Sequence, residues 1–66
     1  MDEPQRVEFR DVVILGTSKG MVRCQVDGKV VGVPRLRMLP GSTARWAGDV
    51  GTLVLTRYVA ENLGLA

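Results

Sequence analysis

A two-residue turn between two alternating apolar stretches constrains the fold of this 66-residue chain more than any other feature. The turn is Asp27-Gly28, and Asp-Gly favours a type I′ hairpin because both central positions then need positive φ. If the loop has two residues, the strands cover 21–26 and 29–34, and their side chains alternate between two faces. The core face carries Val22, Cys24, Val26, Val31 and Val33, and the outer face carries Met21, Arg23, Gln25, Val30 and Gly32.

A first strand is expected before this hairpin. It runs from Arg6 to Gly16 and contains a run of β-branched and other apolar residues, 12–15. That run predicts burial on both faces or a strand bent across two halves of a barrel. The composition of 16–20 then indicates a turn.

A fourth strand is expected over 52–56. Alternation places Leu53 and Leu55 on one face and Val54 on the other, where it adds to the apolar surface of Met21 and Val30. Because this strand leads into a helix and not into a partner strand, we expect an open sheet edge beside it.

The chain ends in a pattern typical of a short helix over 57–63. Thr56 is a suitable N-cap, and Gly64 a suitable C′ residue. Val59 and Leu63 are four residues apart and therefore lie on one helix face. We expect this helix to plug an open end of the barrel.

These elements predict an all-β fold, a small single-domain barrel that is OB-like or SH3-like, with about four to five strands and a short C-terminal helix. Residues 1–5 are expected to be a flexible N-terminus and residues 6–66 the barrel domain. A chain of this length buries roughly 60% of its unfolded surface. Its core then supplies about 3–5 kcal/mol. With one cysteine no intramolecular disulfide adds to this, and a homo-oligomer is a reasonable expectation.

Positive charge is concentrated in the middle of the chain. Residues 19–45 hold six basic residues and one acidic residue, although the net charge of the whole chain is only +2. Arginine outnumbers lysine seven to two, which suits bidentate recognition of phosphate or carboxylate. A basic, merely solvated face is the alternative. The candidate nucleic-acid-binding residues are Lys19, Arg23, Lys29, Arg35, Arg37, Arg45 and Trp46.

Catalytic chemistry is not expected. The chain has no histidine, so neither a Cys–His pair nor a typical zinc site can form, and its acidic residues are dispersed. The segment 16–20 lacks the glycine-lysine-Ser/Thr order of a phosphate-binding loop. We therefore expect no enzyme, no metal and no cofactor. The absence of a signal-like N-terminus or a bilayer-spanning run, together with the single Cys24, favours a cytoplasmic protein without a membrane contact.

Two stretches resemble a group of short bacterial and phage proteins of unassigned function. The first is the hairpin VDGKVVGVP (26–34), and the second is GDVGTLVL (48–55) with YVAENLGL (58–65). The group carries an "IDG-E-V-W-VP" hairpin and a "GD-GTL-V-S-W-A-E-K-GL" ending. This chain departs from it at Gly32, where the group has a large residue, and at Tyr58, where it has tryptophan. The resemblance implies a small β-barrel.

More distantly, GMVRCQVDGKVV (20–31) is similar to the "NGMFRVELENGHVV" stretch of the OB barrel of translation initiation factor one. OB barrels bind RNA on a sheet face and its flanking loops. The resemblance implies that Arg23 lies on the binding side, with Lys19 and Arg37 in flanking loops. An OB barrel needs a fifth strand, whereas this chain ends in a helical pattern.

Two functions therefore remain open. The first is binding of RNA or single-stranded DNA through the basic residues. Aromatic platforms are few, because Phe9 is expected in the core and Trp46 either closes the barrel mouth or forms an exposed platform. The alternative is a protein–protein interaction module, an adaptor, inhibitor or oligomeric subunit, with a possible phage origin.

Overall fold

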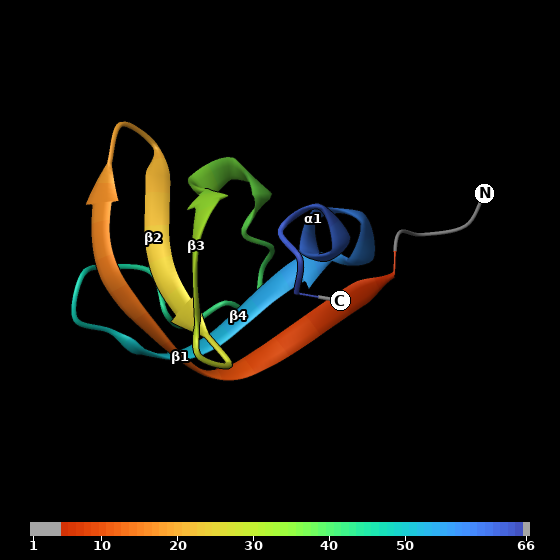
Figure 1. Ribbon diagram of the computed structural model, residues 1–66, viewed down its shortest axis with the longest axis horizontal. Helices are drawn as coiled ribbons and strands as arrows, with labels where there is room; N and C mark the ends of the chain where they lie inside the picture. Colours follow the sequence, from red (N-terminus) through yellow and green to blue (C-terminus); the bar gives the residue numbers. More distant parts are fainter. Residues whose placement is uncertain (1–4, 66) are drawn as a thin grey trace.

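The computed structural model describes residues 5–65, which form one antiparallel sheet and a short C-terminal helix (Figure 1). The sheet order is β3-β2-β1-β4. The predicted all-β class with four strands and a C-terminal helix is confirmed. Within residues 5–65 there is no fifth strand. The elements are β1 (Arg6–Ser18), β2 (Met21–Val26), β3 (Lys29–Pro34), the 3₁₀ turn η1 (Arg35–Arg37), β4 (Val50–Thr56) and α1 (Arg57–Asn62).

The β2–β3 hairpin has the predicted register. Val26 pairs with Lys29 and Val22 with Val33. Asp27 and Gly28 have φ values of 49° and 82°, as a type I′ turn requires. The core-face residues Val22, Cys24, Val26 and Val33 are buried and Val31 is half-buried, whereas the outer-face residues Met21, Arg23, Gln25 and Val30 are exposed.

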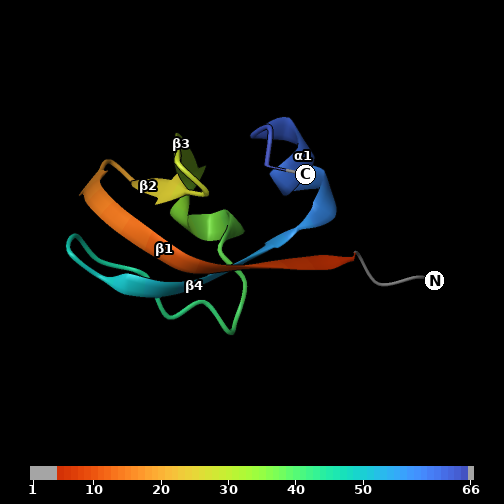
Figure 2. The same ribbon diagram turned by 60° about the horizontal axis from the view of Figure 1, so that its bottom comes forward.

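The first strand is long and bent, and it holds the sheet together. Its first part, 6–13, pairs with β4, and its second part, 13–18, pairs with β2. Each pairing contains a register shift, and Asp11 has a positive φ of 58° at the first of them. The sheet curls around the core as a result (Figure 2). Of the two predicted explanations for the apolar run, bending is correct, because Leu15 is exposed.

The expected open edge at β4 is wrong. Segment 39–44 runs along that edge and bonds to it: Leu39 N–H donates to the Val54 carbonyl, and the amides of Thr43 and Ala44 donate to the Thr52 carbonyl. The Ser42 hydroxyl accepts from Val54 N–H at 2.9 Å. Val54 is consequently buried under this segment, so its predicted outward exposure is also wrong. Alternation assigned its face correctly but could not show that a loop covers it.

Helix α1 closes one end of the curled sheet. The Thr56 hydroxyl accepts from Val59 N–H, as predicted for the N-cap, and Gly64 has the positive φ expected at C′. The helix ends one residue earlier than predicted, at Asn62. Ala60 is buried, and Val59, Leu63 and Leu65 pack against the core.

Of the predicted flexible N-terminus, residues 1–4 lie outside the described residues. Gln5 is bonded to the start of α1: its carbonyl accepts from Arg57 N–H at 2.8 Å. No helix within residues 5–65 is long and apolar enough to cross a bilayer.

Candidate nucleic-acid interface

An arginine–tryptophan stack is the centre of the candidate site. The guanidinium carbon of Arg35 lies 4.2 Å from the centroid of the Trp46 ring. Arg35 begins η1, and Trp46 lies in the loop before β4, so the stack joins two segments across the curled sheet. Trp46 is 62% exposed, which shows that it is not a core residue. Because Arg35 covers one face, the rest of the ring surface is open to a ligand.

The loop that carries Trp46 is held from both sides. Asp49 accepts hydrogen bonds through Oδ2 from the backbone amides of Arg45, at 3.1 Å, and Trp46, at 2.9 Å. Arg35 Nη1 donates to the Arg45 carbonyl, and Arg45 Nε donates to the Ser42 carbonyl. These bonds hold the backbone of the loop, and the contact with Arg35 holds the ring. A hollow of about 180 Å³ lies between Arg35, Met38, Arg45 and Trp46.

Two more of the predicted basic residues, Lys19 and Arg37, lie near this stack. Arg35 N–H donates to the Gly20 carbonyl at 2.8 Å, which brings the β1–β2 turn and its Lys19 beside η1. Arg37 ends η1 and is exposed. The structure thus gathers Lys19, Arg35, Arg37, Arg45 and Trp46 around one end of the sheet, and we call this set the stack cluster.

The remaining two candidates lie elsewhere. Arg23 stands on the outer face of β2, paired with Gly32 on β3. Lys29 follows the β2–β3 turn, and its Nζ donates to the Gly64 carbonyl at 2.8 Å. This bond ties Lys29 to the segment that follows α1. Lys29 lies at the start of β3, whereas the stack cluster lies beyond the end of that strand.

Within residues 5–65, Asp49 is the acidic residue whose side chain bonds to this loop. The sequence indicated it only as part of a turn. Hydrogen bonds from the amides of Trp46 and Arg45 lower the pKa of its carboxyl. An aspartate in a turn commonly bonds backbone that follows it, whereas Asp49 bonds amides that precede it, so no local pattern in the sequence indicates this contact.

A folded-state pKa below the unfolded value means that Asp49 stabilises the loop above the usual aspartate pKa of about 3.9. That stabilisation is lost as the pH falls through the folded-state pKa. We expect Trp46 fluorescence to stay constant from pH 7 to about 5 and to change below pH 4. The Asp49→Asn variant, which cannot ionise, should lose this acid transition. An identical transition in the variant would contradict the assignment.

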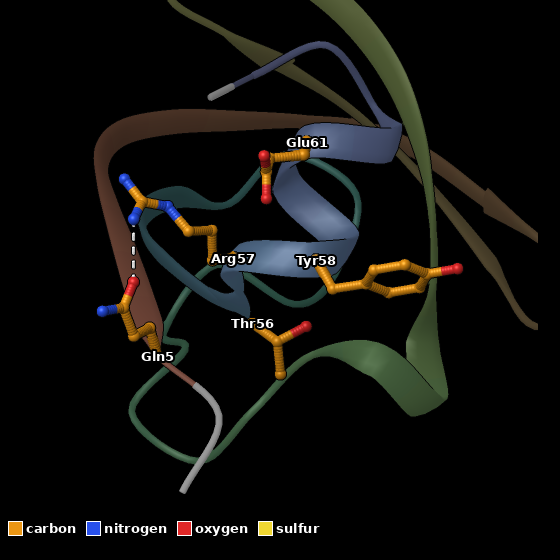
Figure 3. Close-up of a pocket in the computed structure, with 5 residues that line it drawn as sticks. All are labelled: Gln5, Thr56, Arg57, Tyr58 and Glu61. Carbon is orange, nitrogen blue, oxygen red and sulfur yellow. Dashed lines mark hydrogen bonds between the residues drawn. The ribbon is translucent and has the colours of Figure 1, made fainter. Parts of the chain in front are cut away.

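A second hollow, of about 400 Å³, lies beside α1 and is lined by Gln5, Thr56, Arg57, Tyr58 and Glu61 (Figure 3). Its polar groups are largely engaged within the protein. Arg57 Nη1 donates to Gln5 Oε1 at 2.8 Å, and Thr56 caps the helix. The Tyr58 ring points away from the Arg57–Gln5 pair and is 76% exposed. This hollow contains none of the predicted site residues.

Comparisons of the chain with protein-family models, with curated proteins and with solved structures find no match. The assignment of function therefore depends on the chemistry of the described residues. No group of three or more His, Cys, Asp or Glu side chains is placed to hold a metal ion in 5–65. Burial raises the pKa of the Cys24 thiol, so this group is not activated as a nucleophile.

Proposed function

We propose that this protein is a small, cytoplasmic, non-enzymatic module that binds RNA or single-stranded DNA. The observation that carries the proposal is the exposed Trp46 ring, held against Arg35 within the most basic part of the chain. Single-strand binders combine an aromatic platform, on which a base stacks, with basic side chains that contact the backbone. The stack cluster supplies both.

The two parts of the site have different roles. A base stacks on Trp46, on the ring surface that Arg35 leaves uncovered. Lys19, Arg37 and Arg45 contact phosphates, with Arg23 extending the basic surface along β2. Such contacts carry no sequence information, so binding is expected to be sequence-tolerant and strongly salt-dependent.

Titration of the protein with a fluorescent oligouridine or oligothymidine at 50 and 200 mM salt tests the proposal. If four basic side chains contact phosphates, the slope of log K against log salt is about −2.8, which weakens binding about 50-fold over this range. In the Arg23→Ala/Arg37→Ala variant two contacts are lost, and the slope should fall to about −1.4.

The matched control is Arg6→Ala/Arg10→Ala, which removes the same charge from the first half of β1. This control should keep most of the wild-type affinity and slope. Absence of binding by the wild-type protein at 50 mM salt would refute the proposal. Equal losses of affinity in the two double variants would refute the proposed binding surface, because affinity would then depend only on the net charge of the protein.

We further propose that the sheet closes as an SH3-like barrel. The bent β1 is shared by both halves of the sheet, and the 3₁₀ turn η1 lies between the last two strands. These features support this closure over an OB-like one. The resemblance to short bacterial and phage proteins is compatible with either closure.

Self-association through β3 is the second candidate function. β3 is an edge strand that pairs only with β2 within residues 5–65. Its outer-face residue Val30 is 52% exposed, and no charged side chain interrupts 30–34. An uncovered apolar edge favours pairing with a second copy. Light scattering on the titration sample measures the mass, and a monomer at high protein concentration would refute this candidate.

A further inference from the structure

On the outer face of the sheet, Arg23 is flanked by glycine on both sides. It pairs with Gly16 on β1 and with Gly32 on β3, so no side chain stands directly beside it in the sheet. In a paired sheet, directly opposite residues normally pack their side chains against each other. On the β1 side the backbone at Gly16 is bare, whereas on the β3 side the terminal methyl of Met21 lies 3.4 Å from the Cβ position of Gly32.

The fold does not require glycine at either position. Neither residue has a positive φ, so the register shift before Gly16 does not need glycine's conformational freedom. A Cβ at Gly16 would have no neighbouring atom within 4 Å. A Cβ at Gly32 would meet only the flexible end of Met21, at 3.4 Å. Glycine weakens a strand interior, so these two glycines lower stability without serving the fold.

The space beside Gly16 is a shallow furrow with a defined lining. A hollow of about 260 Å³ is bounded by Gly16, Thr17, Ser18, Met21 and Arg23. It combines a flat peptide floor, an apolar thioether wall, the Ser18 hydroxyl and a guanidinium, whereas the Thr17 side chain shares the face of its partner Val22. Next along the chain is Lys19, and the Gly20 carbonyl bonds to Arg35 of the stack cluster. The charges that border the furrow on that side are therefore positive.

We propose that this furrow is a second nucleotide subsite, which holds one unpaired base and its phosphate next to the stack cluster. The base lies on the backbone of Gly16 against the Met21 side chain. Arg23 binds the phosphate, with the hydroxyl of Ser18 as a further donor. This inference rests on the proposed function and adds to it a specific role for Gly16.

Filling the furrow tests the proposal. In Gly16→Val a β-branched side chain enters the space beside Arg23, and affinity for oligouridine should fall at least about 5-fold, the lower end of the value of one stacked base. Thermal stability should stay constant or rise, because valine favours strands and the backbone is compatible. Gly16→Ala provides a smaller change should the valine variant fail to fold.

The matched control is Gln25→Val, which introduces the same side chain on the same face of β2, one row away from the furrow. It should bind like the wild-type protein. If Trp46→Ala weakens binding but folded glycine variants bind normally, the furrow subsite is refuted and the proposed function stands. If the wild-type protein binds no oligonucleotide, both are refuted. Binding of an acidic peptide in place of oligonucleotide, lost in the same variants, would also overturn the nucleotide assignment.

Discussion

Replacing Trp46 by alanine is expected to weaken binding of single-stranded RNA or DNA by about 5- to 150-fold, the value of one stacked base. The ring is 62% exposed and contacts Arg35 at its surface, so its removal leaves the core unchanged. Trp46→Phe keeps an aromatic face and should retain part of the affinity.

Fluorescence anisotropy of a labelled oligonucleotide measures this loss. Because Trp46 is the only tryptophan, quenching of intrinsic fluorescence in the wild-type protein reports independently whether a base stacks on it. Tyr58→Ala is the control, since it removes another exposed aromatic residue, on α1 and outside the stack cluster. Equal losses in Tyr58→Ala and Trp46→Ala, or binding without a fluorescence change, would contradict the platform.

Replacing Leu53 by alanine is expected to remove most of the stability of the protein at 25 °C. Leu53 is fully buried in β4 and pairs with Phe9 of β1, next to the register shift in that strand pair. A buried Leu→Ala change costs about 2–5 kcal/mol. A core of this size supplies only about 3–5 kcal/mol, so little stability remains.

Urea denaturation followed by circular dichroism measures this effect. Val50→Ala is the control, because Val50 lies in the same strand but is 66% exposed, and its loss should change stability by less than about 0.5 kcal/mol. A cooperative transition in Leu53→Ala with a midpoint close to that of the wild type would show that the core extends beyond the described contacts, for example through an oligomer.

Local signals made the hairpin predictable. The Asp27-Gly28 turn fixes register through backbone geometry, and register then decides which face each valine occupies. The helix caps at Thr56 and Gly64 are local in the same sense. By contrast, the hydroxyl of Ser42 reaches the amide of Val54, and no periodicity in the sequence indicates such a contact between a loop and a strand.

The sequence indicated which residues belong to the candidate site, but it did not indicate how they are arranged in space. Charge clustering identified the basic residues, and Trp46 was singled out with its role left open. The stack between Arg35 and Trp46 depends on how η1 and the loop before β4 meet. The bond of Lys29 to the carbonyl of Gly64 depends on where α1 ends. Both contacts follow from tertiary structure, which spacing alone does not specify.

The loop over 39–44 also limits how copies of this protein can join. By occupying the hydrogen-bonding groups along one side of β4, it leaves β3 as the uncovered edge strand of the sheet within residues 5–65. If two copies joined through β3, each would present only its covered β4 edge to the solvent. Growth by strand addition would then stop at a pair.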